Sequence, residues 1–265
     1  MHIYTYTKKK IYFIIILFFL LISTVIILFL FSKLKLNYIT TSGNIELNMN
    51  FQYKINHLIG QKEKIAYLTF DDGPTISSTP KVLDILKEED VKATFFVIGK
   101  YVKNHPDLIQ RVYEEGHFIA NHGYNHKASK LIESNESFIQ EIKQTDLEIG
   151  KALNIPNYSS HVFRFPYGFS SSYYNNNREN LSDLLKSLNY TYIDWNCLNK
   201  DSERKTSNSE LLNNLKKSCK NKGTLVILMH DTTDVNDSSA VLKESISFLK
   251  SQGYIFENFY SLLNE

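Results

Sequence analysis

Residues 67–74 read Tyr67-Leu68-Thr69-Phe70-Asp71-Asp72-Gly73-Pro74. The aromatic, branched and apolar residues at its start favour a strand. Two carboxylates and a Gly-Pro turn then end that strand. Asp-Gly-Pro is by itself most often only a turn, so Asp71 and Asp72 gain a functional interpretation only if other reactive side chains gather at the same place.

Around this stretch, from Lys64 onward, short β-branched or aromatic runs alternate with segments of helical period, which indicates βα units and a largely parallel sheet. We expect strands at 65–70, 93–98, 117–120, 162–165, 190–195, 224–229 and 254–256, and helices at 79–88, 106–115, 134–153, 180–188, 209–220 and 240–251. Thr79 before Pro80 is typical of an N-cap, and Gly116 and Gly253 are typical of helix ends. The pattern fits either an α/β barrel or a doubly wound sheet.

Composition and charge exclude several classes of protein. The 265-residue chain is 43% hydrophobic and 22% charged, which is ordinary for a folded domain and unlike disordered or collagen-like chains. Residues 1–35 hold five lysines and no acids, so the rest of the chain carries 25 basic and 28 acidic residues. Such a mildly acidic body lacks the clustered basic residues that phosphate contacts need, and we expect no nucleic-acid partner.

The N-terminal part has the pattern of a membrane anchor. Residues 11–31 are apolar apart from three positions, and as a helix they would be about 32 Å long against about 30 Å of hydrocarbon. A cleaved signal peptide, the alternative, would have a shorter apolar core and a small-residue cleavage site. Three lysines before the segment and two after it favour a cytoplasmic N-terminus.

These features predict four parts: a cytoplasmic tail (1–10), a transmembrane anchor (11–31), a polar stalk (32–61) with a short strand near 51–55, and a folded body (62–265) outside the cell membrane. In an extracellular body Cys197 and Cys219 could pair, with two unreactive thiols as the alternative. Two cysteines are too few for a Cys-rich metal site.

Reactive residues lie at or just beyond the ends of three further expected strands. His122 and His126 form an H-x-x-x-H pair, which puts both imidazoles on one side of a helical turn. Arg164 lies at the end of an expected strand, before a Pro-Tyr-Gly turn, and His230 follows the apolar run 225–229. Each alone is more ordinary as a core, surface or turn residue.

Parallel strands place their carboxyl ends at one edge, where active sites of α/β barrels and open sheets lie. We therefore expect these residues to gather with Asp71 and Asp72. Together they supply metal ligands, a carboxylate base, a cation and a second histidine, the set that metal-assisted hydrolysis requires.

The same residues form four ordered motifs that resemble the polysaccharide deacetylases with a NodB-homology domain, carbohydrate esterase family 4. The motifs are Thr-Phe-Asp-Asp-Gly-Pro (69–74), Asn-His-x-x-x-His (121–126), Arg-x-Pro-Tyr-Gly (164–168) and Leu-Met-His-Asp (228–231). The resemblance covers about residues 64–260 and makes 62–265 the catalytic domain. It implies an α/β fold, a distorted (β/α) barrel of about seven parallel strands, and a hydrolase that removes N-acetyl groups from amino sugars.

The resemblance also implies the cofactor and its ligands. Asp72, His122 and His126 match a metal-binding triad, with zinc as the usual ion and cobalt or nickel as alternatives. Three protein ligands leave an open position for water and the acetyl carbonyl. This chain departs from the family at Gly123, where Ser or Thr is usual, so one supporting hydrogen bond is expected to be missing.

The other roles implied by the resemblance concern proton transfer and charge. Asp71 matches the general base, and Arg164 matches the residue that keeps it ionised and oriented. The backbone N–H of Tyr167 matches an oxyanion donor. His230 matches the general acid, and Asp201 the carboxylate that tunes this histidine.

Near Asp201 the chain departs from the family again. Leu198 replaces a commonly polar residue and Ser202 replaces a Trp, so we expect the wall of the substrate groove to be built differently. Two further residues receive structural interpretations. Trp195 is expected in the core, and His117 is expected to be structural and not a fourth ligand.

The sequence thus predicts a single-pass, membrane-anchored enzyme that deacetylates N-acetylglucosamine units of an extracellular polysaccharide, peptidoglycan first. Alternative substrates are chitooligosaccharide, other surface glycans, N-acetylmuramic acid residues and O-acetylated sugars. A non-catalytic cell-wall binding module and an amidase acting on a non-sugar substrate are the alternatives from other classes. The intact Asp71, Arg164 and His230 argue against a binding module, which needs neither acid nor base.

Overall fold

The computed structural model describes residues 49–263. The expected tail 1–10, the membrane segment 11–31 and most of the stalk 32–61 lie outside the described residues. Among the helices of residues 49–263, none is long and apolar enough to cross a membrane.

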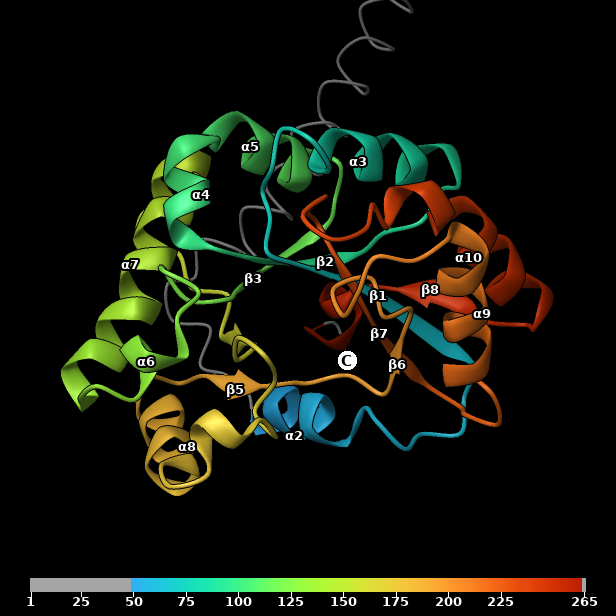
Figure 1. Ribbon diagram of the computed structural model, residues 1–265. Helices are drawn as coiled ribbons and strands as arrows, with labels where there is room; N and C mark the ends of the chain where they lie inside the picture. The colour runs from blue at the N-terminus through green and yellow to red at the C-terminus, as the bar shows by residue number, and fades with distance from the viewer. Residues whose placement is uncertain (1–48, 264–265) are drawn as a thin grey trace, which may run out of the picture. The chain divides into compact units, whose positions relative to one another are not determined.

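The body is built on a sheet whose paired strands all run parallel (Figure 1). The strands are β1 (Ile65–Asp71), β2 (Thr94–Val97), β3 (Phe118–Asn121), β4 (Val162–Phe163), β5 (Thr191–Tyr192), β6 (Cys197–Leu198), β7 (Leu225–His230) and β8 (Ile255–Glu257). Seven of them follow the order β5-β4-β3-β2-β1-β7-β6, and β8 pairs with the first half of β1. The curled half-barrel that results agrees with the distorted barrel implied by the resemblance.

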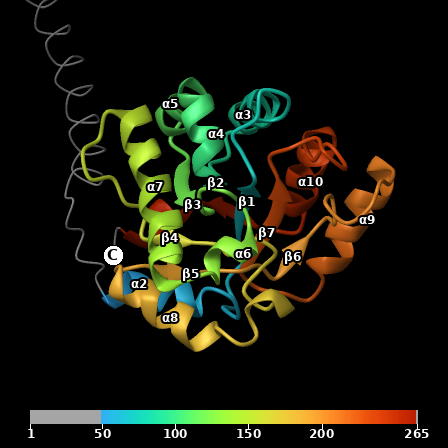
Figure 2. The same ribbon diagram turned by 60° about the vertical axis from the view of Figure 1, so that its left-hand side comes forward.

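Helices surround the sheet, as the two views in Figures 1 and 2 show. They are α2 (Met49–His57), α3 (Thr79–Glu88), α4 (Gly99–Asn104), α5 (Pro106–Glu114), α6 (Ala128–Leu131), α7 (Asn135–Leu153), α8 (Arg178–Ser187), α9 (Asn208–Ser218) and α10 (Ser239–Ser251), with 3₁₀ turns η1 (Ser172–Tyr174) and η2 (Phe259–Leu263). All six expected helices are confirmed, and Gly116 and Gly253 have the positive φ of residues after a helix end. The expected N-cap is wrong by one residue: Ser78 is the N-cap and Thr79 begins α3.

Side chains of β1 and β7 alternate between two cores. Leu68 and Phe70 belong to the outer core beneath the helices, whereas Tyr67 belongs to the inner core of the curled sheet. The same alternation places Asp71 on the inner face at the carboxyl end of β1. Asp71 is in register with His230 of β7, so the two lie side by side at that edge.

Helix α2 closes the inner core. Its Phe51 and Ile55, with Leu58 just after it, are buried against inner side chains such as Tyr67 and Phe259 of η2. The strand expected near residues 51–55 is therefore wrong. The spacing of four and three residues between these apolar side chains is that of a helix, and this part of the predicted stalk packs into the body.

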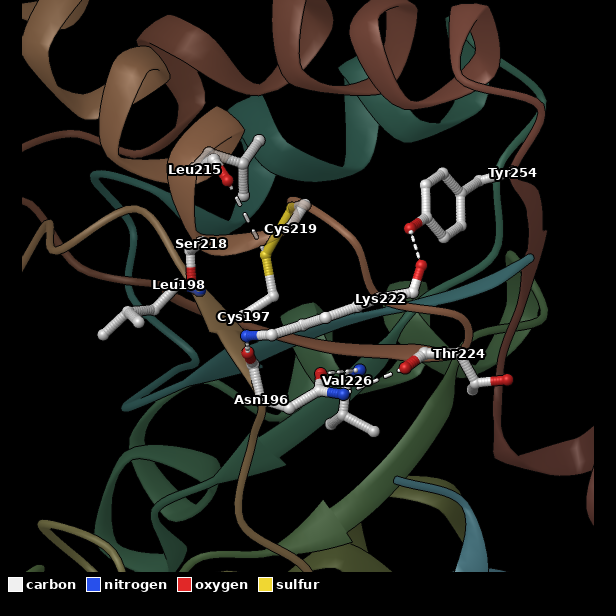
Figure 3. Close-up of a disulfide and its surroundings, with 10 residues drawn as sticks. All are labelled: Asn196, Cys197, Leu198, Leu215, Ser218, Cys219, Lys222, Thr224, Val226 and Tyr254. Carbon is white, nitrogen blue, oxygen red and sulfur yellow. Dashed lines mark hydrogen bonds between the residues drawn. A yellow bond between two sulfur atoms is a disulfide. The ribbon is translucent and has the colours of Figure 1, made fainter. Parts of the chain in front are cut away.

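A disulfide joins Cys197 of β6 to Cys219 at the end of α9, with the Cα atoms 5.5 Å apart (Figure 3). A second link runs beside it, where Leu198 N–H donates to Ser218 Oγ at 3.1 Å. Of the two alternatives left open by the sequence, the structure has the pair and not the free thiols.

Candidate active site

Asp71 and Arg164 form a buried ion pair at the carboxyl end of β1. Arg164 is fully buried and donates from Nη1 to Asp71 Oδ1 at 2.8 Å and to Thr69 Oγ1 at 2.6 Å. Its Nε donates to the Ile193 carbonyl at 3.0 Å, and its guanidinium lies 4.0 Å from the ring centroid of Phe96. Burial of a charge is costly unless it is paired and hydrogen-bonded, and this arrangement pairs the buried guanidinium and fixes the orientation of the Asp71 carboxylate.

Next to this pair, Asp72, His122 and His126 bring three potential ligand atoms within 4.8 Å of one another. Asp72 Oδ1 lies 3.4 Å from His122 Nε2 and 3.0 Å from His126 Nε2. His122 Nδ1 lies 2.7 Å from the Arg164 carbonyl. Because a carbonyl can only accept, Nδ1 carries a proton, and Nε2 is the ring nitrogen that faces the cluster.

The cluster fits a divalent cation. Asp72 Oδ1 is buried, and no described residue gives it a well-directed hydrogen bond. Burial, with the neighbouring His122, lowers the pKa of His126 to about 4, so this imidazole is neutral at pH 7 and able to act as a ligand. One carboxylate and two imidazoles form a ligand set of the kind that catalytic zinc sites use.

Three residues of the site hold their backbone in the left-handed region. The φ angles are 72° at Asp72, 55° at His126 and 68° at Tyr167. Such conformations cost roughly 1–3 kcal/mol each and gather at functional sites, where the surrounding structure enforces them. Here they turn two ligands and the Tyr167 peptide away from the regular course of their segments.

On the other side of Asp71, His230 is paired with Asp201. His230 Nδ1 lies 2.6 Å from Asp201 Oδ1, and the His230 backbone N–H donates to Oδ2 at 2.8 Å. Burial alone would lower the pKa of His230, but the hydrogen bond and charge of Asp201, together with Asp71 and Asp72, raise it to about 9. The imidazole is therefore protonated at neutral pH.

Tyr167 borders the ligand cluster. Its ring centroid is 5.2 Å from that of His126 and 5.2 Å from that of Tyr173. Its side chain is 56% exposed. Within the described chain, no acceptor is hydrogen-bonded to its backbone N–H, so this donor remains available to a ligand.

A family model described as polysaccharide deacetylase matches residues 59–193. The chain belongs to the polysaccharide deacetylase family. Among curated relatives, the peptidoglycan-N-acetylmuramic acid deacetylase PdaA of Bacillus subtilis is 30% identical over 88% of this chain and 84% of its own length. A peptidoglycan-N-acetylglucosamine deacetylase of Bacillus cereus is 34% identical over 82% of this chain and 76% of its own.

Solved structures agree with the family assignment. A CE4 esterase of Streptococcus mutans superposes with a TM-score of 0.68 at 29% identity, covering 78% of this chain and 89% of the esterase. The polysaccharide deacetylase Bc1974 of Bacillus cereus gives 0.65 at 33% identity, covering 74% and 92%. This polysaccharide deacetylase is accordingly an enzyme of carbohydrate esterase family 4.

The structure brings the predicted metal ligands and the residues with predicted catalytic roles to one edge of the deacetylase sheet. Asp71 connects the two halves of the site: its Oδ2 lies 3.7 Å from His122 Nε2, and its strand neighbour is His230. His117 stands apart, buried, with Nδ1 accepting from the Ala93 N–H at 3.1 Å. Trp195 is half-buried and packs against the inner core.

Sequence reasoning missed the residues that hold Asp201. Ser238 Oγ donates to Asp201 Oδ2, and Asn236 Nδ2 donates to the Asp201 carbonyl at 2.7 Å. These residues lie more than 30 positions along the chain from Asp201 and belong to no motif. The only sign of them in the sequence was that two small polar residues precede an expected helix.

Proposed function

We propose that this deacetylase is a metal-dependent enzyme that removes N-acetyl groups from N-acetylglucosamine units of peptidoglycan. The observation that carries the proposal is the position of Asp71, between a three-residue ligand cluster on one side and a protonated His230 on the other. Peptidoglycan is favoured because the curated relatives that cover most of the chain are named as peptidoglycan deacetylases.

Asp72, His122 and His126 would hold the metal, for which we propose zinc before cobalt or nickel. When bound, such an ion polarises the acetyl carbonyl and lowers the pKa of a water molecule. The residues of the chain carry out the two proton transfers, one on the side of Asp71 and one on the side of His230.

On the base side, Asp71 accepts a proton from the attacking water. The ion pair with Arg164 orients the carboxylate, because Arg164 is itself fixed by Thr69 and Ile193. The N–H of Tyr167 donates to the oxygen that gains negative charge as water adds to the carbonyl carbon.

On the acid side, His230 gives its Nε2 proton to the amide nitrogen. Asp201 occupies Nδ1, so only Nε2 faces the substrate. Protonation lets the carbon–nitrogen bond break with the amine as leaving group, and the products are acetate and the free amino sugar.

We further propose that the catalytic domain is extracellular and anchored by residues 11–31. The apolar character of this segment supports the anchor. The buried Cys197–Cys219 disulfide supports an oxidising compartment, where disulfides persist.

N-acetylmuramic acid is the second candidate substrate, because PdaA, named for that sugar, matches over most of the chain. The test is acetate release by the full-length protein in mild detergent from isolated peptidoglycan and from chitin oligomers, with zinc or with a chelator. Chelator-sensitive release from peptidoglycan supports the proposal, and mass spectrometry of the digested glycan assigns the lost acetyl group to one sugar. A folded, zinc-loaded protein that releases none from any amino-sugar polymer would refute it in favour of a wall-binding module.

A further inference from the structure

The loop between the two histidine ligands is held by a carboxylate from another element. Glu141 of α7 accepts through Oε2 from the backbone N–H groups of Tyr124 and Asn125, both at 2.8 Å. Its Oε1 accepts from Asn125 Nδ2 at 2.5 Å. One side chain thus accepts three hydrogen bonds from two of the three residues that separate His122 from His126.

The rest of this loop is fixed as firmly. Gly123 N–H donates to Asn121 Oδ1 at 2.9 Å. The carbonyls of Gly123 and Tyr124 accept from the first backbone N–H groups of α4, those of Gly99 and Lys100, at 3.0 and 3.1 Å. Glu141 therefore completes the pairing of the loop's backbone donors, and its removal would leave two of them without a partner.

Glu141 is buried, with 5% of its surface exposed, on the inner face of α7 beside Phe138 and Ile142. A buried carboxylate is retained at low cost only where hydrogen bonds replace water, and the loop donates three hydrogen bonds to the Glu141 carboxylate. The carboxylate also lies against Gly123: a Cβ at this position would be 3.5 Å from Oε2. Gly123 has no side chain to support the loop, and Glu141 fills that role from outside it.

We propose that Glu141 is a positioning residue that sets the spacing of His122 and His126 for a divalent cation. The inference rests on the metal site of the proposed function. In this inference Glu141 of α7 supplies the hydrogen bonds that a side chain at position 123 cannot supply. A loop of three residues can bring two imidazoles to one ion only if its peptide groups are fixed beforehand. Loss of such support for metal ligands typically costs about 10- to 100-fold in metal affinity.

The test measures the zinc dissociation constant of the full-length protein by competition with a chromophoric chelator. Glu141→Ala and Asn125→Ala remove the contacts from either side, and we expect about 10- to 100-fold weaker binding for Glu141→Ala and a smaller loss for Asn125→Ala. Glu141→Gln keeps one acceptor oxygen and should lose less than Glu141→Ala. The matched control is Glu148→Gln, a second buried glutamate on α7 that pairs with Lys151 and does not touch the loop.

A second readout needs no metal. In the metal-free protein, hydrogen exchange at the amides of Tyr124 and Asn125 should accelerate in Glu141→Gln and stay slow in Glu148→Gln. Zinc affinity within twofold of wild type in folded Glu141→Ala, or an equal loss in Glu148→Gln, would overturn the inference. A wild-type protein that binds no zinc refutes the proposed metal site itself, an outcome that the exchange experiment keeps distinct from failure of the loop contacts.

Discussion

The two ends of the curled sheet are built from opposite chemistry. At the carboxyl ends of β1 and β7, buried charges are paired: Asp71 with Arg164, and His230 with Asp201. Nearer the amino ends, the same inner face is apolar and is covered by α2 and η2 through Phe51 and its neighbours. One sheet thus carries reactive charge at one end and a close-packed core at the other.

The difference indicates how the fold divides its tasks. Buried ion pairs contribute little net stability and are costly to break, whereas burial of an apolar side chain contributes about 1.5–3 kcal/mol. We therefore expect changes at the charged end to remove activity, and changes at the apolar end to remove stability while leaving the chemistry of folded molecules intact.

The largest effect should follow Asp71→Asn. An amide cannot accept the proton of the attacking water, and loss of a general base typically costs about 10²–10⁴-fold in rate. The measurement is kcat for acetate release at saturating zinc. Asp84→Asn, which removes a carboxylate that pairs with Arg111 at the surface of α3, should keep the wild-type rate. A loss smaller than tenfold in Asp71→Asn would exclude Asp71 as the base.

At the apolar end, Phe51→Ala should lower the free energy of unfolding by about 3–5 kcal/mol, the cost of emptying a buried aromatic site. Urea denaturation of the full-length protein checks this, with kcat measured below the transition. Tyr53→Ala is the matched control, because Tyr53 lies on the same helix with 61% of its surface exposed. Equal effects of the two variants would show that α2 does not seal the core.

Much of the fold could be predicted because its strands are buried apolar runs of distinct period. β1 and β7 are long enough to stand out, and their ends locate the site. Helix α2 was missed because Phe51 and Ile55 lie in a polar, Asn-rich segment where only three apolar residues carry the helical spacing. β6 was missed because its two residues lie in a polar stretch, whereas β4 and β5, equally short, lie within longer apolar and aromatic runs.

The site divides in the same way. Asp71, Asp72 and the two histidine ligands were predictable because each motif is local and follows a strand. Contacts between distant segments were not: Glu141 reaches the ligand loop from the next long helix, and Ser238 reaches Asp201 from 37 positions away. The position of Glu141 between the apolar residues Phe138 and Ile142 was a usable signal, although α7 buries other acidic residues as well.

The disulfide lies close in sequence to the charged end of the sheet, because the chain runs from Cys197 of β6 directly to Asp201. Its removal therefore tests whether stability and catalysis can be separated there. Replacing Cys197 and Cys219 together by Ala should lower the free energy of unfolding by about 2–4 kcal/mol. The Asp201–His230 contact should survive, because Ser238 and Asn236 hold Asp201 independently. Urea denaturation and the pH profile of kcat check the two parts. Reduced wild-type protein should match the variant, and unchanged stability in both would show that the link is dispensable.

The smallest effect concerns Asp201→Asn and appears only in the pH dependence. A rate that needs protonated His230 is full below the pKa of that residue and falls as pH rises through it. In the metal-free protein this pKa is about 9, and Asp201 is the main group that raises it against burial. A bound cation repels the same proton, so the alkaline limb of the zinc-loaded enzyme should lie between 6.5 and 9.

Asparagine can still accept from Nδ1 and keep the ring oriented, but it supplies no charge. The alkaline limb of Asp201→Asn should therefore lie at least one pH unit below that of wild type, with kcat about tenfold lower above the limb and nearly unchanged below it. Asp237→Asn, which removes a nearby carboxylate paired with Lys81, should leave the limb in place. If the alkaline limbs of Asp201→Asn and wild type coincide, Asp201 does not raise the pKa of His230. An equal loss of kcat at every pH would then mean that Asp201 acts only by positioning the His230 ring.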